Sequence, residues 1–298
     1  MGDLKVLTSA DLPRLPRRPI DAFKTSVGSV LVVAGSYGMA GAAYLTAISA
    51  LRAGAGYVRV ATAKSVYPIL ATLVPSAVFV PLDCTDDAIV KASEVDKVLK
   101  EAGASKVAVM GPGWGDKPEA AKLFYALMEE LQIPKVLDAN MLGLLGRRRD
   151  LYARLTPNDV LTPHPGEMGD LLGMKGTDVQ KDRLRSVRKL VELTGAVAVL
   201  KGARTLVCDG KRLYRNTSGN AGMAKAGAGD VLSGMVGALM AQGLSAFDSA
   251  TLGVYIHGKA GDIAAAREGR GLTADALSAA IPQAIRRYER GRFERGGV

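Results

Sequence analysis

The chain has 298 residues, of which 48% are hydrophobic and 23% charged, values that are typical of a globular protein and exclude a disordered or fibrous one. Its net charge of +10 is compatible with a polyanionic ligand, but solvated clusters such as Arg147–Arg149 can also supply it, and an aromatic content of only 5% argues against stacking on nucleic acid. Two distant cysteines, no secretory signal and no apolar run of about 18 residues exclude a disulfide framework and a membrane span, so we expect a cytoplasmic protein.

Short apolar runs rich in β-branched residues alternate along the chain with longer amphipathic stretches. The expected strands cover residues 29–34, 56–62, 77–82, 106–110, 135–138, 159–162, 196–201 and 205–209, the last two forming a hairpin around Gly202. The expected helices cover residues 42–53, 230–242, 246–267 and 273–288. This alternation predicts an α/β fold with a mostly parallel central sheet and helices on both faces. Because no linker or repeat divides residues 1–298, we expect a single domain with its core at about 20–285.

Glycine-rich segments follow several of the expected strands. Three of them, at residues 35–41, 111–115 and 162–167, lie at the carboxyl ends of strands, and a fourth, at residues 219–230, precedes a helix. Ligands of open α/β sheets bind beyond the carboxyl ends of the strands. The four segments together therefore predict a ligand cleft at one edge of the sheet.

The segment Ala226–Gly234 is the most informative of these. Its small residues leave backbone N–H groups accessible, and the positive end of the following helix dipole adds to them, so the segment predicts an anion site. Asp230, in the first turn, is either a plain helix cap or a base that takes a proton from a hydroxyl attacking phosphorus. The Walker A spacing and a GxGxxG after the first strand are both absent, which disfavours a P-loop NTPase and a Rossmann dehydrogenase.

Other polar residues are less specific. His164 stands between two prolines after a strand and is expected to face a ligand, whereas His257 lies within a helix and is expected to be a packed core or interface histidine. Lys201 ends a strand, where its ammonium group either reaches the ligand or extends into solvent. Three residues at strand ends carry oxygen atoms that could bind Mg²⁺ through water: Asp138, Asn140 and Glu167. The sequence alone does not assign the metal ligands.

Five motifs, taken together, resemble those of one family. They are Gly35–Ala43, Leu51–Gly56, Gly111–Gly115, Leu161–Glu167 and Gly219–Gly234. Their order and spacing are similar to those of the ADP/ATP-dependent NAD(P)H-hydrate dehydratases, also known as the YjeF carboxy-terminal domain family. The match runs from about residue 20 to 285, and it implies a ribokinase-like fold. Because the first motif begins so early, we expect no amino-terminal epimerase domain, which many members of the family carry.

The resemblance implies a carbon–oxygen lyase that repairs the S-form of hydrated NADH and NADPH. The ring hydroxyl is a poor leaving group, and its phosphorylation by ADP or ATP with Mg²⁺ makes it a good one. The phosphorylation releases AMP or ADP, and elimination then gives NAD(P)H and phosphate. The family further implies a homo-oligomer, for which a tetramer is plausible from the resemblance. From composition we expect neither nucleic acid nor a membrane as a partner.

The family also implies roles for residues that match its motifs. Asp230 would contact the substrate and act as the base, and Gly229 would bind the nucleotide. The hydrated nicotinamide would be lined by Ala43, Gly113 and His164. The nucleotide-binding stretch would be Lys201, Gly202, Ala203, Arg204 and Thr205. Ala226 and Ala228 depart from the usual Gly-Gly-Ser/Thr-Gly-Asp, and the hydroxyl that Ala228 lacks would remove one phosphate contact.

Two alternatives remain open at this stage. The first is a small-molecule kinase of the same fold, acting for example on a vitamin precursor, which would share the anion site and the base. The second is a non-catalytic protein that senses nucleotides or binds nucleic acid. A stable phosphorylated product would favour the kinase, and salt-sensitive binding to DNA or RNA would favour the non-catalytic protein.

Overall fold

In the computed structural model, which describes residues 4–293, ten strands form one sheet in the spatial order β1-β10-β9-β8-β7-β6-β5-β2-β3-β4. The strands are β1 (Lys5–Leu7), β2 (Ser29–Val33), β3 (Tyr57–Ala63), β4 (Val78–Leu82), β5 (Val107–Met110), β6 (Lys135–Leu137), β7 (Val160–Leu161), β8 (Val197–Leu200), β9 (Leu206–Cys208) and β10 (Arg212–Arg215). Among these described strands, only β9 runs antiparallel to its neighbours, β8 and β10. The mostly parallel sheet expected from the sequence is confirmed.

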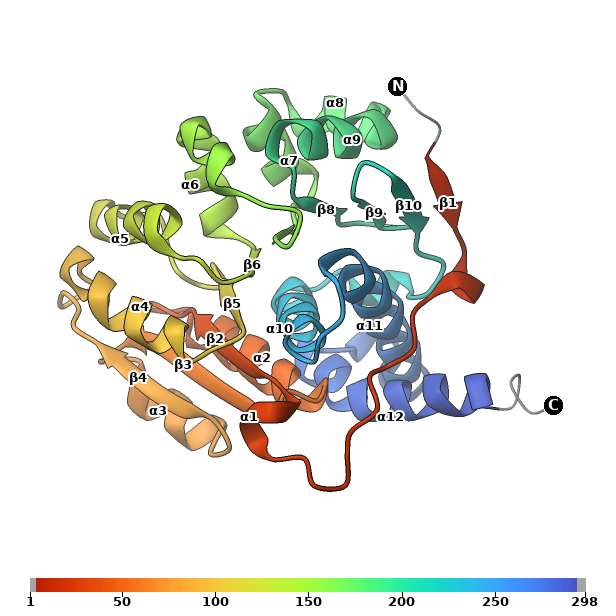
Figure 1. The fold of residues 1–298 in the computed structure, drawn as a ribbon, viewed down its shortest axis with the longest axis horizontal. Helices are drawn as coiled ribbons and strands as arrows, with labels where there is room; N and C mark the ends of the chain where they lie inside the picture. Colours follow the sequence, from red (N-terminus) through yellow and green to blue (C-terminus); the bar gives the residue numbers. More distant parts are fainter. Residues whose placement is uncertain (1–3, 294–298) are drawn as a thin grey trace.

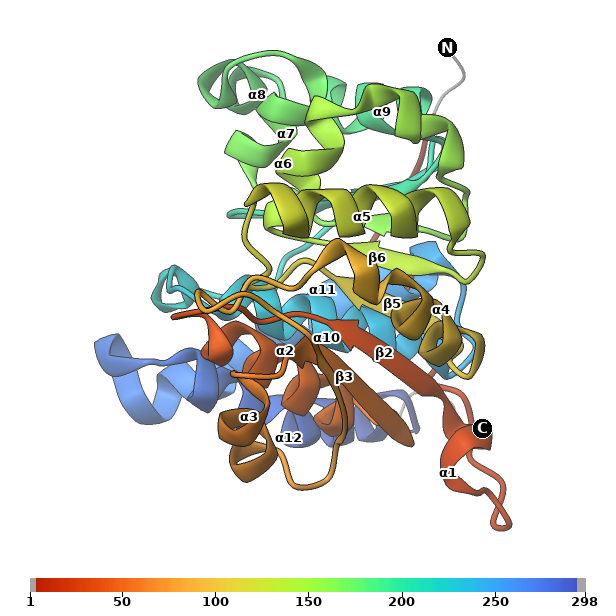
Figure 2. The same ribbon diagram turned by 90° about the vertical axis from the view of Figure 1, so that its left-hand side faces the viewer.

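Helices cover both faces of this sheet. They are α1 (Lys24–Val27), α2 (Ala40–Arg52), α3 (Tyr67–Leu73), α4 (Val95–Gly103), α5 (Pro118–Glu130), α6 (Asn140–Arg147), α7 (Pro165–Leu172), α8 (Gly176–Lys181), α9 (Arg183–Thr194), α10 (Ala228–Ala241), α11 (Ala246–Glu268) and α12 (Ala274–Phe293). Helices α2, α10 and α11 pack on one face, with α12 behind them, while α5, α6, α7 and α9 lie on the other face (Figures 1 and 2).

The central strands are buried on both sides, and this explains their composition. Every residue of β2, β5 and β8 is buried, so each position can be apolar and the strands read as continuous runs. By contrast, β1 and β10 are short and partly exposed, and we did not expect them from the sequence. Strand β1 exists because its three residues pair in parallel with β10 at the edge of the sheet.

Helix α10 packs closely on α2 and over the middle of the sheet. A Cβ atom at Gly234 would overlap the carbonyl oxygen of Thr46 in α2, and one at Gly237 would overlap the side chain of Val109 in β5. Glycine at these positions therefore lets α10 lie directly on its neighbours. This close packing fixes the start of α10, where the predicted anion site lies, against the carboxyl ends of the strands.

The glycine-rich loops gather at that edge of the sheet, as expected. Strands β2, β5, β6, β7 and β8 are parallel, so the residues that follow each of them emerge on the same side. In the part of the chain that the structure describes, no helix has the length and apolar character needed to cross a bilayer. Both cysteines, Cys84 and Cys208, are free thiols.

Candidate active site

The predicted anion site is the first turn of α10. The helix begins at Ala228 after Gly227, whose φ of +89° lies in the left-handed region and where a Cβ atom would meet the side chain of Leu45. The first amide groups of a helix have no acceptor within the helix, and among residues 4–293 no side chain caps this one. The amide of Ala228 donates to the carbonyl of Lys225 at 3.4 Å, so the N–H groups of Gly229 and Asp230 and the helix dipole remain available to an anion.

Asp230 is the third residue of α10 and does not cap it, so the interpretation as a plain helix cap is wrong. Within residues 4–293, no hydrogen bond to its carboxylate is found. Burial raises the pKa of Asp230 to about 7, and the negative charges of Asp138 and Glu167 add to this, while Lys201 opposes it. A carboxyl group with this pKa is well suited to accept a proton near neutral pH.

Asp138 and Lys201 form a buried ion pair next to the start of α10. Lys201 Nζ lies 2.6 Å from Asp138 Oδ1, and the hydroxyl of Ser233 donates to Asp138 Oδ2 at 2.5 Å. Burial favours the neutral form of Asp138, but the charge of Lys201 and these hydrogen bonds outweigh it and lower the pKa of Asp138. Burial also opposes the charge on Lys201, yet Asp138 and Glu167 raise the pKa of Lys201. The pair is therefore ionised at neutral pH.

His164 and Glu167 cap each other at the start of α7. The amide groups of Gly166 and Glu167 donate to His164 Nδ1 at 3.0 and 3.1 Å, and the amide of His164 donates to Glu167 Oε2 at 2.7 Å. Since Nδ1 accepts two hydrogen bonds, the proton of the neutral ring is on Nε2, which lies 3.4 Å from Glu167 Oε1. His164 thus presents an N–H donor at the edge of the sheet. Glu167 also lies 3.6 Å from Lys201 and links α7 to the buried pair.

The other two residues expected at the nicotinamide lie in adjacent loops. Gly113 has a φ of +62°, and a Cβ atom there would meet the backbone of Met39, just before α2. The hydroxyl of Ser36 donates to the carbonyl of Gly113 at 2.8 Å and holds the two loops together. Ala43 is fully buried in the first part of α2, so it acts as a small spacer rather than as a polar contact.

A cavity of about 870 Å³ brings together the residues expected to bind the nucleotide. Its lining includes Gly229 and the whole turn Lys201, Gly202, Ala203, Arg204 and Thr205. The opposite wall comes from the loop at residues 216–224 and from α11. Asp230 does not line this cavity, whereas its neighbour Gly229 does, and a Cβ atom at Gly229 would lie 3.4 Å from Lys201 Nζ. The cavity therefore meets the charged cluster of Asp138, Glu167, Lys201 and Asp230 at the start of α10.

His257 belongs to this cavity, and sequence reasoning missed that role. It lies in α11, lines the cavity, and its Nε2 is 2.9 Å from the carbonyl oxygen of Ala228. Burial lowers the pKa of His257 to about 4, so the ring is neutral and donates this hydrogen bond from Nε2. His257 thereby fastens α11 to the first residue of α10. The sequence showed only a histidine within a helix, with no sign of a partner 29 residues away.

The oxygen atoms considered for Mg²⁺ are engaged with protein groups. Asp138 binds Lys201 and Ser233, and the side-chain oxygen of Asn140 accepts a hydrogen bond from the amide of Gly115 at 3.2 Å. Within residues 4–293, no three His, Cys, Asp or Glu side chains are grouped so that they could hold a metal ion. The described side chains therefore do not form a metal site of their own.

Comparison with known proteins identifies the family. A family model described as NAD(P)H-hydrate dehydratase matches residues 30–283. The chain is 37% identical over 272 residues to the ADP-dependent (S)-NAD(P)H-hydrate dehydratase of Neisseria meningitidis serogroup B, covering 90% of this chain and 87% of that protein. It is also 39% identical over 286 residues to a bifunctional NAD(P)H-hydrate repair enzyme of Thermofilum pendens, covering 95% of this chain but 54% of that protein. The chain thus spans about half the length of several of the bifunctional relatives that it matches.

Solved structures agree with this assignment. The ADP/ATP-dependent NAD(P)H-hydrate dehydratase of Bacillus subtilis, co-crystallized with ATP and Mg²⁺, matches with a TM-score of 0.77 and 26% identity, covering 92% of this chain and 95% of that one. A ribokinase-like superfamily protein of Enterococcus faecalis has a TM-score of 0.82 at 23% identity, which confirms the ribokinase-like fold. The family suggested by the sequence motifs is thus confirmed: this chain belongs to the NAD(P)H-hydrate dehydratase family.

Proposed function

We propose that this protein dehydrates the S-form of hydrated NADH and NADPH, using ADP or ATP as phosphoryl donor and releasing NAD(P)H, phosphate and AMP or ADP. The observation that carries the proposal is the position of Asp230. This carboxyl group has a raised pKa and stands beside the free amide groups of α10, where the nucleotide cavity meets the charged cluster. Family membership and the named activity of the Neisseria relative support the same reaction.

Each part of the site has a role in the proposed reaction. Asp230 takes the proton from the ring hydroxyl as that oxygen bonds to the terminal phosphorus of the nucleotide, and the bond from this phosphorus to the departing AMP or ADP breaks. The amide groups of α10 and the ammonium group of Lys201 stabilise the negative charge of the phosphoryl group during transfer. The lone pair of the ring nitrogen then expels phosphate and forms an iminium, and loss of a proton from the adjacent ring carbon to water restores the double bond. His164 would orient the hydrated nicotinamide through its Nε2–H group, with Gly113 and Ala43 at the same site.

Mg²⁺ enters this proposal with the nucleotide. The described side chains group into no metal site, and Mg²⁺ in phosphoryl-transfer enzymes takes many of its ligands from phosphate oxygens and water. The ion would neutralise phosphate charge when it is bound. We assign no protein ligand to it.

The remaining expectations complete the proposal. We propose a cytoplasmic location, where adenine nucleotides are available and the thiols of Cys84 and Cys208 stay reduced. We also propose that the protein is a homo-oligomer, and light scattering would detect a tetramer. We further propose a single domain over residues 1–298 with its core at about 20–285. The continuous ten-strand sheet supports the single domain.

The test is recovery of the near-ultraviolet absorbance of reduced nicotinamide from hydrated NADH in the presence of Mg²⁺ and either ADP or ATP. Asp230→Asn should reduce kcat about 10²–10⁴-fold and leave the nucleotide Kd within a few-fold, because the carboxylate acts on the proton. The matched control is Asp170→Asn, since Asp170 is exposed on α7. An Asp230→Asn enzyme that keeps most of its activity would show that Asp230 is not the base. A phosphorylated product that accumulates without elimination would favour a kinase instead.

A further inference from the structure

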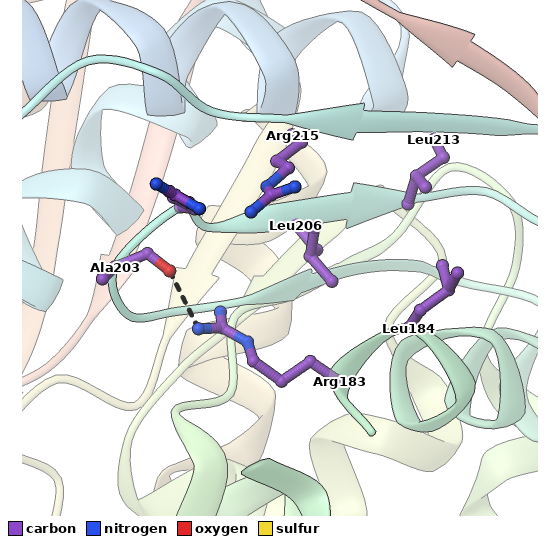
Figure 3. A pocket seen from close by; sticks show the side chains of 7 residues that line it. Arg183, Leu184, Ala203, Leu206, Leu213 and Arg215 are labelled. Atoms are coloured by element: carbon purple, nitrogen blue, oxygen red, sulfur yellow. Dashed lines mark hydrogen bonds between the residues drawn. The ribbon is translucent and has the colours of Figure 1, made fainter. Parts of the chain in front are cut away.

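A second cavity, of about 300 Å³, adjoins the nucleotide cavity across the turn at residues 201–205. Its lining consists of Arg183, Leu184, Ala203, Arg204, Leu206, Leu213 and Arg215. Ala203, Arg204 and Arg215 also line the nucleotide cavity, so the two cavities share a wall. Figure 3 shows the side chains of Arg183, from α9, and Arg215, from the end of β10, extending toward the turn that carries Ala203. We call this cavity the arginine pocket.

The positive charge of the arginine pocket is not balanced by protein groups. In the described part of the chain, no carboxylate lies within ion-pair distance of Arg183, Arg204 or Arg215. The guanidinium group of Arg183 donates instead to backbone carbonyls, that of Ala203 at 2.9 Å and that of Leu200 at 3.0 Å. Burial, together with the nearby charge of Arg215, lowers the pKa of Arg183. Cations held close together without a counter-ion repel each other, and an anion between them removes this repulsion.

Two of the three arginines are free to bind a ligand. The structure shows no side-chain hydrogen bond from Arg204 or Arg215 among residues 4–293, whereas Arg183 is occupied with the turn. The guanidinium group has a planar set of donors that matches the oxygens of a phosphate. Leu184, Leu206, Leu213 and Ala203 make up the apolar part of the lining, which supplies most of the pocket surface and offers few competing acceptors. The pocket is much smaller than its neighbour and suits a single anionic group rather than a whole nucleotide.

We propose that the arginine pocket is a second anion subsite that takes a phosphate group beside the bound nucleotide. The phosphate has two possible sources that share this chemistry. It is either carried on the ribose of the adenine nucleotide in the neighbouring cavity or it is free inorganic phosphate. The proposal rests on the proposed function, because it assumes that the neighbouring cavity binds the nucleotide. Arg215, the residue tested for anion binding, has no role in the proposed reaction.

The first experiment compares AMP with two ligands that each carry one additional phosphate on the ribose. The Kd values of AMP, adenosine 2′,5′-bisphosphate and adenosine 3′,5′-bisphosphate are measured by calorimetry at constant ionic strength. If the phosphate is carried on ribose, one bisphosphate binds about tenfold more tightly than AMP. Arg215→Gln brings this ratio close to one, and Arg215→Lys, which keeps the charge but not the planar donors, restores part of it. The matched control Arg185→Gln removes one exposed positive charge from α9 outside the pocket and leaves the ratio unchanged.

The second experiment titrates inorganic phosphate into the AMP-saturated protein. If the phosphate is free, it binds to wild type and to Arg185→Gln, and Arg215→Gln weakens it about tenfold. If the bisphosphates bind no better than AMP and phosphate shows no binding that depends on Arg215, the pocket is only a solvated cationic surface and the proposal is overturned. Failure of AMP itself to bind would contradict the proposed function instead. Phosphate titration of the free protein would then still decide whether the subsite exists.

Discussion

Asp230 should make the native protein less stable as the pH rises, and the loss can be calculated from its surroundings. Its pKa rises from 3.8 to about 7 in the native structure because the carboxyl group is buried near Asp138 and Glu167. Between these two pH values the unfolded chain has released the proton while the native protein keeps it. Stability therefore falls as the pH rises from about 4 to about 7, and the full penalty is present above that range.

The magnitude follows from the size of the pKa change. At about 1.4 kcal/mol for each pKa unit, a change of about three units corresponds to an ionisation penalty on the order of 4 kcal/mol. About two pH units separate pH 5 from the raised pKa, so the ionisation penalty that develops between pH 5 and pH 8 is about 3 kcal/mol. Asp230→Asn removes the titration but keeps the size of the side chain. The variant should therefore gain on wild type by this amount as the pH is raised.

Thermal unfolding at pH 5 and pH 8 measures this effect. The Tm of Asp230→Asn minus that of wild type should increase by roughly 6–12 °C between the two pH values, given about 2–4 °C per kcal/mol for a domain of a few hundred residues. The control Asp170→Asn, at an exposed carboxyl group, should show no such increase. Equal Tm differences for Asp230→Asn at both pH values would refute the reasoning, because they would mean that Asp230 titrates alike in the native and unfolded states.

Three further substitutions test the site and its support. His164→Ala should raise the KM for the hydrated dinucleotide, and it should lower the free energy of unfolding by about 1 kcal/mol because Nδ1 caps α7. His164→Asn should restore the stability but not the KM. Urea unfolding measures the change in stability and initial rates measure the change in KM. Ser233→Ala removes a buried hydrogen bond to the charged Asp138 and should cost about 1.5–3 kcal/mol in urea unfolding. Gly234→Ala should lower the free energy of unfolding by about 1–3 kcal/mol, because its Cβ overlaps a carbonyl oxygen of α2. The control Gly143→Ala, whose Cβ meets open space in α6, should not destabilise the protein. A loss of stability in both variants would refute the packing argument.

The sequence predicted the central part of the fold because those strands are buried on both faces. The expected strand at residues 29–34 is found as β2, Ser29–Val33, and the run at residues 106–110 as β5, Val107–Met110. Strands β1 and β10 were missed for the opposite reason. They lie at or next to an edge, are partly exposed, and carry no continuous apolar run. Their pairing depends on contacts across some 200 residues, which local composition does not encode.

The same limit applies to the site. Asp230 could be selected from the sequence because small residues and a helix start surround it locally. The burial of Asp230 could not be predicted from the sequence, and neither could the opposite directions in which the pKa values of Asp230 and Asp138 are shifted. The three carbonyls that Arg183 contacts and the bond from His257 to Ala228 also join segments that are distant in sequence. Sequence motifs therefore identified the groups that we propose contact the ligand, while the residues that hold those groups in place required the structure.

The different roles of the two aspartates follow from where the hydrogen-bond donors lie. Asp138 accepts hydrogen bonds from Lys201, Ser233 and the amide of Ala139, so its charge is stabilised and three of its lone pairs are occupied. Asp230 accepts none from residues 4–293, so burial acts on it without compensation and its affinity for a proton rises. The proposed base needs this second environment, because a carboxylate whose charge is stabilised by a cation and several hydrogen bonds has a low affinity for a proton. In the proposed reaction, the pair of Lys201 and Asp138 thus keeps a positive charge beside the phosphate without neutralising Asp230, the proposed proton acceptor.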